Sequence, residues 1–222
     1  MMKKLLQIDN ITYSTGINGR LVRVTTALEE GGILNVRGPS GSGKTTLLRI
    51  VARLKEAGEG SVFLEGRPWT EYSPVEWRRK VHYLAQKPAI FDGPVEANLK
   101  KPFELAAVKK EMRFTPERAQ ELLERLLLPT DLLTQDARTL SGGEASRLCL
   151  IRSILVDPVL LLLDEPLAAL DRKAADAALG LIAEWVNARA GRGVLLVSHA
   201  GGMERLPSVA VLDIGEEEGD CR

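Results

Sequence analysis

Residues 38–45 of this 222-residue chain read Gly38-Pro39-Ser40-Gly41-Ser42-Gly43-Lys44-Thr45, which fits G-x-x-x-x-G-K-[ST] at every fixed position. An apolar strand candidate, Ile33–Val36, precedes this loop, and a helical stretch, Thr45–Leu54, follows it. Glycines let backbone N–H groups turn inward around phosphate oxygens, and the helix N-terminus adds partial positive charge. The loop therefore predicts a phosphate site, with Lys44 reaching the β- and γ-phosphates and the Thr45 hydroxyl ligating Mg²⁺. We include Thr46 among the nucleotide-binding residues.

Short apolar runs and helical stretches alternate on both sides of this loop, which predicts an α/β fold. Two runs, Val159–Leu163 and Val194–Val197, are continuously apolar, as a strand covered on both faces requires, so they predict the centre of a parallel sheet. The remaining strand candidates, two of which precede the loop in a predicted N-terminal antiparallel subdomain, are Leu6–Tyr13, Leu21–Leu28, Ser61–Leu64, Val81–Leu84 and Val209–Ile214.

Helix starts follow from capping chemistry. Ser73-Pro74-Val75-Glu76 is a capping box with Pro at the first helical position. Further helices are predicted from Thr115-Pro116 to about Leu128 and from Asp171 to about Ala190. Residues 87–153 lack strand signals, so we expect one domain with a core over about 1–86 and 154–214, an inserted helical subdomain over about 87–153 and an acidic tail over 215–222.

Composition narrows the class of protein. Thirty Lys and Arg balance thirty Asp and Glu, which argues against a generally basic nucleic-acid binder, so we expect no nucleic acid partner. The apolar run Val159–Leu163 is far below the roughly 20 residues of a membrane span, and the N-terminus lacks the apolar core of a signal peptide. Two Cys without a C-x-x-C pair favour neither disulfides nor zinc. We expect a cytoplasmic protein.

A second motif, Leu160-Leu161-Leu162-Leu163-Asp164-Glu165-Pro166, ends a buried strand in two carboxylates. Such a strand delivers carboxylates to the carboxyl edge of the sheet, where ligands bind in these folds. Asp164 is placed to hold Mg²⁺, and Glu165 is placed to accept a proton from the attacking water. A solvated acidic turn is the alternative explanation, and the phosphate-binding loop upstream makes it the weaker one.

A third motif, Leu140-Ser141-Gly142-Gly143-Glu144, precedes the helical stretch Ala145–Val156. Ser141 and Glu144 form a capping box, so the start of a helix explains both residues. It leaves two consecutive glycines unexplained, each of which costs about 1 kcal/mol relative to Ala within a helix. Glycines there let another group approach the helix N-terminus, and an anion is the natural candidate.

These three motifs together resemble the ATP-binding cassette (ABC) family over about residues 6–214. By that resemblance, Gln86 matches the glutamine that links Mg²⁺ to the helical subdomain, and His199 matches the histidine that contacts the γ-phosphate. Tyr13 matches the aromatic side chain that stacks on adenine, and Ala168–Asp171 matches a loop that usually reads S-A-L-D. Glu144 stands where the family more often has Gln. His82 and Cys149 are assigned to structure.

The resemblance implies a head-to-tail dimer with two ATP molecules between the subunits. Each ATP would contact Lys44 of one chain and Ser141, Gly142 and Gly143 of the other, with Glu144 in the same binding set. Lys44, Gln86, Glu165 and His199 are the expected catalytic residues, and Thr45, Gln86 and Asp164 the expected metal ligands. ATP and Mg²⁺ are the expected cofactors, and the partner cassette is a second copy or a related chain.

The sequence indicates the ATPase chemistry more clearly than the process that the ATPase drives. The resemblance implies the ATP-binding subunit of a transporter, peripheral on the inner face of the membrane, with a separate integral membrane permease. The segment after Gln86, residues 87–99, contains Ile90, Phe91 and a Gly-Pro turn before a short helix. These apolar side chains could dock a partner, or equally could fill the core of the helical subdomain. The pattern is similar to exporter-type cassettes assigned to iron export.

Other classes of P-loop ATPase fit the sequence less well. A cassette that drives assembly, as in iron–sulfur cluster biogenesis, would carry the same motifs, so it remains the alternative function. Chromosome-organising ATPases need a long coiled coil between Lys44 and Leu140, and no sustained heptads occur there. Translation-factor cassettes carry two copies, and a small-molecule kinase has no use for residues 140–144.

Overall fold

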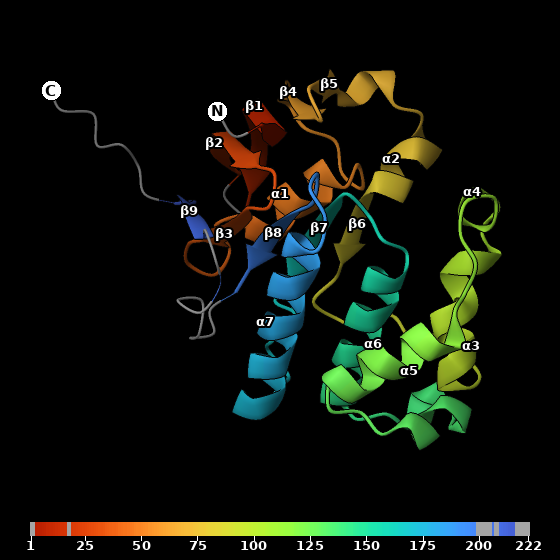
Figure 1. Ribbon diagram of the computed structural model, residues 1–222. Helices are drawn as coiled ribbons and strands as arrows, with labels where there is room; N and C mark the ends of the chain where they lie inside the picture. The colour runs from red at the N-terminus through yellow and green to blue at the C-terminus, as the bar shows by residue number, and fades with distance from the viewer. Residues whose placement is uncertain (1–2, 17–18, 199–205, 207–208, 216–222) are drawn as a thin grey trace, which may run out of the picture.

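The computed structural model describes residues 3–16, 19–198, 206 and 209–215, and these form two sheets with helices around them (Figure 1). The larger sheet is parallel, with the strand order β6-β7-β8-β3-β9. The smaller sheet is antiparallel, with the order β2-β1-β4-β5. The strands are β1 (Lys4–Thr15), β2 (Arg20–Glu29), β3 (Ile33–Arg37), β4 (Glu59–Leu64), β5 (Arg67–Pro68), β6 (Val81–Leu84), β7 (Leu160–Asp164), β8 (Gly193–Val197) and β9 (Val209–Asp213).

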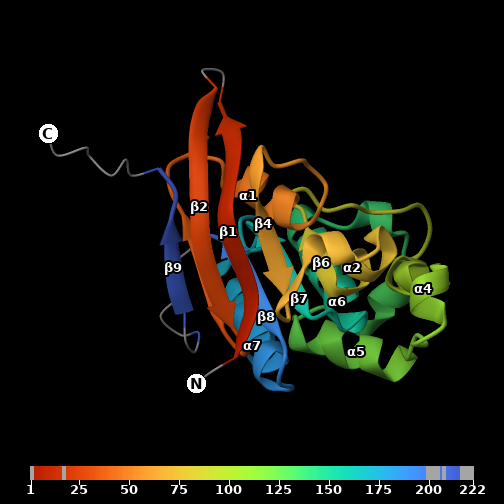
Figure 2. The same cartoon turned by 90° about the horizontal axis from the view of Figure 1, so that it is seen from above.

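The helices between β6 and β7 lie on one side of the parallel sheet, as the view in Figure 2 shows. The α-helices are α1 (Lys44–Val51), α2 (Pro74–Lys80), α3 (Val95–Lys100), α4 (Ala106–Lys109), α5 (Pro116–Arg125), α6 (Gly142–Leu155) and α7 (Arg172–Asn187). Short 3₁₀ turns are η1 (Trp69–Glu71), η2 (Lys101–Glu104), η3 (Thr130–Thr134) and η4 (Ala137–Thr139). Among the described residues, none of these helices combines the length and the hydropathy of a membrane span.

The two predicted central strands do lie at the centre, and both faces of each are covered. In β7 all five residues are buried, and the side chains of its four leucines divide between two hydrophobic clusters. Leu161 and Leu163 belong to the cluster with α3, α5, α6 and α7, whereas Leu160 and Leu162 belong to the cluster with α1 and the antiparallel sheet. The period of two along the strand therefore points alternate side chains to a face covered by helices and to a face covered by α1 and the antiparallel sheet.

The predicted helix starts at Ser73 and Asp171 are confirmed by their side-chain caps, whereas α5 begins at Pro116 as predicted but Thr115 forms no side-chain cap. The Ser73 side chain accepts a hydrogen bond from the Glu76 N–H, and the Glu76 carboxylate accepts one from the Ser73 N–H, with Pro74 at the first helical position. The Asp171 carboxylate accepts from Ala174 N at 2.9 Å. Helices α5 and α7 end at Arg125 and Asn187, three residues before the predicted ends. The acidic tail from residue 216 lies outside the described residues.

Candidate active site

The loop between β3 and α1 has the backbone shape that its glycines predict. Gly41 and Gly43 have φ angles of 79° and 104°, a left-handed region that other residues seldom adopt. The Lys44 ammonium folds over the loop and donates to the carbonyl oxygens of Gly38 and Pro39 at 2.8 and 2.9 Å. One cation therefore lies at the mouth of a ring of backbone amides, which is a suitable environment for the phosphates of a nucleotide.

Asp164 is brought beside this loop by the end of β7. The carboxylate is 1% exposed, and it accepts hydrogen bonds from the Thr45 hydroxyl at 3.0 Å and the Tyr83 hydroxyl at 2.9 Å. Burial and the neighbouring Asp164 charge raise the pKa of Tyr83, with the Arg49 guanidinium acting against them, so the phenol stays a donor at neutral pH. A hydroxyl and a carboxylate at this spacing are hard oxygen donors of the kind that Mg²⁺ prefers.

Glu165 follows Asp164 and meets Gln86 from the end of β6. Gln86 Nε2 donates to Glu165 Oε2 at 2.8 Å. Glu165 has a φ of 50°, in the left-handed region, and its N–H is bonded to the Val197 carbonyl of β8 at 2.9 Å. This unusual backbone turns the Glu165 side chain away from the direction that a continuing strand would give it, towards the loop that carries Gln86.

Tyr13 is adjacent to the loop, and it is 3% exposed. A Cβ added at Gly43 would lie 2.8 Å from Tyr13 Cε2, so this glycine lets the ring pack against the loop. Burial raises the pKa of the Tyr13 hydroxyl. Stacking on adenine requires an accessible ring face, so the side chain must turn out of this packing, and its adenine role stays a prediction. His199 lies outside the described residues.

The motif Ser141–Glu144 caps α6 in the predicted way. Glu144 Oε2 accepts from the Ser141 N–H at 2.8 Å and from the Ser141 hydroxyl at 2.7 Å, and Glu144 N donates to Ser141 Oγ at 3.3 Å. Hydrogen bonds from the Ser141 side chain and backbone lower the pKa of Glu144. The carboxylate is therefore ionised at neutral pH and sits at the positive end of α6.

The two glycines of this motif differ in the space around them. A Cβ at Gly143 would lie 2.9 Å from the carbonyl oxygen of Ala169, so Gly143 is required by packing against the loop after β7. A Cβ at Gly142 would meet nothing within 4 Å. Packing within the described residues does not explain Gly142. The close approach of an anion therefore stays a prediction for Gly142 and is not needed to explain Gly143.

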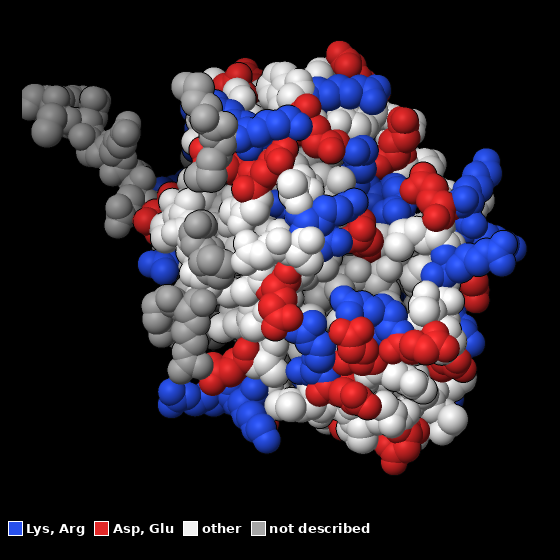
Figure 3. Space-filling model, viewed as in Figure 1, with Lys and Arg blue, Asp and Glu red and all other residues white. Residues whose placement is uncertain are grey.

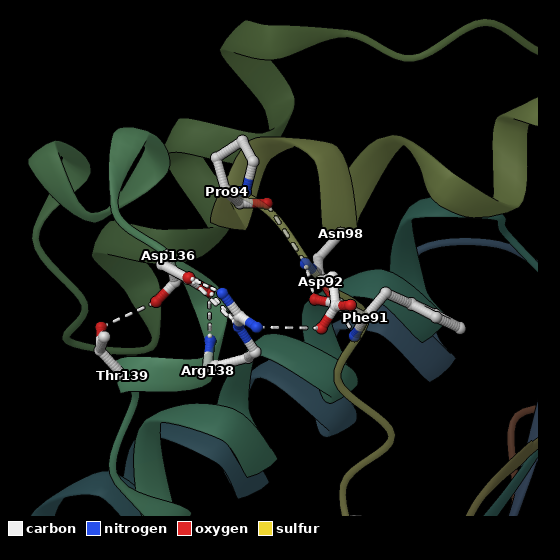
Figure 4. Close-up of polar contacts among 7 residues, drawn as sticks. All are labelled: Phe91, Asp92, Pro94, Asn98, Asp136, Arg138 and Thr139. Atoms are coloured by element: carbon white, nitrogen blue, oxygen red, sulfur yellow. Dashed lines mark hydrogen bonds and ion pairs between the residues drawn. The ribbon is translucent and has the colours of Figure 1, made fainter.

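Two neighbouring residues, Ile90 and Phe91, take opposite roles in the segment after Gln86. Ile90 packs against the cluster around α6, whereas Phe91 is 44% exposed. The buried side chain of Asn98 holds this segment: its Oδ1 accepts from Phe91 N at 2.8 Å, and its Nδ2 donates to the carbonyls of Phe91 and Pro94 at 2.9 and 3.2 Å (Figure 4). Core filling therefore explains Ile90, and partner docking stays a prediction for Phe91.

The same segment is tied to the residues before Ser141. Val95 N donates to the Gln135 carbonyl and Ala137 N to the Gly93 carbonyl, both at 2.9 Å, and Pro94 forms a bridge with Asp136. Arg138 adds an ionic link, because it binds Asp136 at 2.6 Å and lies 3.5 Å from Asp92 (Figure 4). The Phe91 segment is thus hydrogen-bonded to residues 135–137, which lie just before the Ser141 motif.

Three polar side chains of this region were not predicted as site residues by the sequence motifs. Tyr83 gives one signal, a hydroxyl near the carboxyl end of a parallel strand, where ligands gather in such sheets. Asn98 and Arg138 give no comparable signal, because each acts on loop backbone or loop carboxylates that pattern alone cannot bring together. In space-filling view both signs of charge are interspersed over the face of Figure 3, in agreement with the zero net charge.

The chain is similar to the ATP-binding proteins of known transporters. The chain is 38% identical over 167 residues to the probable iron export ATP-binding protein FetA of Escherichia coli, covering 75% of this chain and 72% of that protein. It is 34% identical over 172 residues to the spermidine/putrescine import ATP-binding protein PotA of Bacteroides fragilis, covering 77% of this chain and 36% of that protein.

A solved structure supports the fold independently. The dimeric post-hydrolysis structure of the ATP-binding cassette MJ0796, bound to ADP and phosphate, superposes with a TM-score of 0.78 at 22% identity, over 95% of this chain and 97% of that one. The family model described as ABC transporter matches residues 21–168, which hold the phosphate-binding loop, the Ser141 motif and Asp164-Glu165. The chain therefore belongs to the ABC transporter family and is one of its ATP-hydrolysing cassettes.

Proposed function

We propose that this chain is the ATP-binding subunit of an exporter, that it acts as an ATP-dependent homodimer on the cytoplasmic face of the membrane, and that a separate permease forms the transport path. The observation that carries the catalytic part is the convergence of Thr45, Tyr83 and Asp164 beside the phosphate-binding loop, with Gln86 and Glu165 hydrogen-bonded next to them. Export is favoured over import by the similarity to FetA, and a metal ion is the favoured cargo.

The reaction consumes ATP and water and yields ADP and phosphate. Lys44 and the loop amides hold the phosphates, and Thr45 and Asp164, with Gln86, are the residues that would hold Mg²⁺, which supplies charge neutralisation to the departing ADP oxygen. Glu165 accepts the proton of the water that attacks the γ-phosphorus, and Gln86 orients the Glu165 carboxylate. The new P–O bond forms as the bond to ADP breaks.

The open position at Gly142 supports the proposed dimer. The first turn of α6 presents backbone N–H groups, and no described atom lies within 4 Å of the position that a Gly142 Cβ would take. The γ-phosphate of an ATP held by the loop of a second copy fits this chemistry, because an anion is stabilised at a helix N-terminus. Each copy carries a full set of motifs, so two equivalent sites result.

The permease contact is proposed for the Phe91 segment. Phe91 is a large exposed apolar side chain on a segment that Asn98 fixes, so little conformational entropy is lost when a partner binds. The backbone link from this segment to the Ser141 motif connects the partner with the nucleotide site.

Affinity purification of a tagged Glu165→Gln chain with ATP and Mg²⁺, from detergent-solubilised membranes of the source cells, tests the function. This substitution is expected to keep the closed dimer loaded and to retain a membrane protein of several spans as a stoichiometric partner. Glu117→Gln is a matched control, because Glu117 is exposed on α5 away from the site. A partner set made only of water-soluble assembly proteins would replace the transporter function and leave the ATPase chemistry intact.

A further inference from the structure

A pocket of about 420 Å³ lies between α5, the end of α6 and α7, and we call it the α5–α7 pocket. The two helices lie side by side (Figure 1), and Arg125 of α5 forms an ion pair with Glu184 of α7. Among the described residues that line the pocket, none belongs to the nucleotide site or to the Phe91 segment. Apolar walls are supplied by Phe103, Met112, Ile154, Leu155 and Leu181.

The charged side chains of this pocket are mostly cationic. Its four arginines and two carboxylates are Arg113, Arg118, Arg125, Arg192, Asp157 and Glu184. Both carboxylates are already paired, Glu184 with Arg125, and Asp157 with Arg192 and Arg189. None of the ion pairs among the described residues involves Arg113. The positive charge of the pocket is therefore only partly balanced.

Two buried side chains of the pocket, Arg192 and Trp185, each keep an N–H group without an acceptor. Arg192 is 9% exposed and Trp185 is 5% exposed. The Arg192 guanidinium lies over the indole ring, 4.8 Å from its centroid, and Arg192 Nη1 donates to the Trp185 carbonyl at 2.6 Å. Arg192 Nε and Trp185 Nε1 have no hydrogen-bond partner among the described residues. Buried donors are normally paired, so an acceptor that enters the pocket would satisfy an existing need.

The charges around Arg192 favour a negatively charged acceptor. Burial lowers the pKa of Arg192, the Asp157 carboxylate acts against this shift, and the charges of Arg189 and Arg118 add to it. Burial disfavours any charge, whereas the neighbouring arginines disfavour only a further cation and stabilise an anion. Thr115 also lines the pocket and gives α5 no side-chain cap, so the first turn of this helix adds partial positive charge there.

We propose that the α5–α7 pocket binds a small organic anion that has one carboxylate or phosphate group and an apolar body. The oxyanion pairs with the exposed Arg113 and Arg118 and accepts from the unpartnered N–H groups of the buried pair. The apolar body packs on the walls around Phe103 and Leu181. A pocket of several hundred Å³ is typical of small-molecule sites, and it is larger than an inorganic ion needs. The proposal is independent of the proposed function.

Three probes of similar shape test the chemistry of the site. Phenylacetate and phenyl phosphate carry the two possible head groups, and phenylacetamide is the neutral control. Calorimetry with the full chain measures their affinities in the presence of ADP and Mg²⁺, which fill the nucleotide site. We expect at least one anionic probe to bind about tenfold more tightly than phenylacetamide, because hydrogen bonds to a charged group are stronger than those to a neutral one.

Nuclear magnetic resonance locates the bound probe. The chain has three Trp residues, so its indole N–H resonances are few, and the resonance that Trp185→Phe removes belongs to Trp185. We expect this resonance to shift on titration with the anionic probe, at the affinity that calorimetry gives. The indole N–H of Trp77 donates to the Val51 carbonyl at 2.9 Å, so its resonance is the internal control and should stay in place.

Single arginine variants test the pairing. Arg113→Gln and Arg118→Gln are each expected to lower the affinity of the anionic probe by about fivefold, because each removes one cation from the site. Arg23→Gln, a change at an exposed position of β2, is the matched control and should leave the affinity unchanged. Circular dichroism checks that all three variants are folded.

The outcomes separate the possible ligands. Tighter binding of phenylacetate indicates an organic acid as the ligand, and tighter binding of phenyl phosphate indicates a phosphate ester. Anionic probes that bind no more tightly than phenylacetamide would overturn the proposal. Binding that leaves the Trp185 resonance in place, or that is equally strong in the Arg113, Arg118 and Arg23 variants, would place the anion elsewhere and overturn it as well.

Discussion

Gln86 donates a hydrogen bond to Glu165 across 2.8 Å, and so joins the end of β6 to the residue that follows β7. The two strands are neighbours in the parallel sheet, with Leu84 opposite Leu163, so the contact is set by the sheet itself. A carboxylate that accepts a hydrogen bond from an amide is held in one direction, as the proposed role of Glu165 as general base requires.

The first prediction concerns Glu165. Glu165→Gln removes the proton acceptor and keeps the shape, so turnover should fall by about 10²–10⁴-fold while ATP affinity is retained. Phosphate release in the steady state and nucleotide binding by calorimetry measure the two effects. An unchanged turnover number would contradict the assignment of Glu165 as the general base.

The second prediction concerns Tyr83. Tyr83→Phe removes the hydroxyl that donates to the buried Asp164 carboxylate at 2.9 Å. Loss of one partner of a buried charged acceptor should lower the free energy of unfolding by about 1–3 kcal/mol. Urea unfolding of the nucleotide-free protein measures it. A variant as stable as the natural chain would show that another donor replaces the phenol.

The third prediction separates the adjacent glycines. Gly142→Ala should stabilise the chain by about 0.5–1 kcal/mol, since its Cβ meets open space and helix propensity improves. It should nevertheless weaken ATP-dependent dimerisation, because the methyl group occupies the place of the incoming phosphate.

Gly143→Ala is the matched comparison. Its Cβ would lie 2.9 Å from the Ala169 carbonyl, so it should destabilise the folded chain. Thermal unfolding and sedimentation with ATP separate stability from association. If both variants behaved alike in both measurements, the distinction between the two glycines would be wrong.

The fourth prediction is a pH dependence of stability at the start of α6. The folded pKa of Glu144 lies below its ordinary value of 4.5, because the Ser141 side chain and backbone donate to the carboxylate. The unfolded chain therefore binds the proton more readily, so this contribution is present above about pH 4.5 and is lost as the pH falls through the folded pKa.

Glu144→Gln tests this sign, because Gln keeps the capping box without titrating. As the pH falls below 4.5, the unfolding free energy of the natural chain should decrease relative to that of this variant, because only the natural chain has a carboxylate that is protonated there. Urea unfolding at several pH values measures it. A difference that does not change with pH would rule out the ionic contribution.

The fifth prediction concerns Asn98. Asn98→Ala removes three hydrogen bonds to the Phe91 segment from a side chain that is 1% exposed. We expect a loss of about 1–3 kcal/mol in stability and a weaker permease stimulation of ATP turnover. Asn187→Ala, an exposed helix position, is the control and should change neither. Full stimulation of the Asn98 variant in proteoliposomes would contradict the role of this segment.

The parallel sheet was predictable from the sequence because β7 and β8 are apolar at every position except the terminal Asp164 and Gly193. Only a strand with two covered faces has that pattern. The helix starts at Ser73, Ser141 and Asp171 were predictable because each cap is a local contact over three residues. These features depend on neighbours in the chain, which the sequence displays directly.

Long-range polar contacts were not predictable in the same way. Tyr83 lies 81 positions from Asp164, and no pattern in β6 marks which residue its hydroxyl contacts. The short elements η2 and α4 were also missed, because α4 has four residues and no side-chain cap at Leu105. Ile90 is packed against the core and Phe91 is exposed. This difference depends on how the helical subdomain packs, and the apolar character of the two residues does not predict it.

The backbone bonds of Val95 to Gln135 and of Ala137 to Gly93 have a consequence for energy conversion. They join the segment that carries Phe91 to the residues that precede Ser141. If binding at these two places is coupled, the coupling free energy must be the same in both directions. Under the proposed function, a nucleotide that binds at Ser141 would then change the affinity for the partner at Phe91, and that partner would change the affinity for ATP by the same factor.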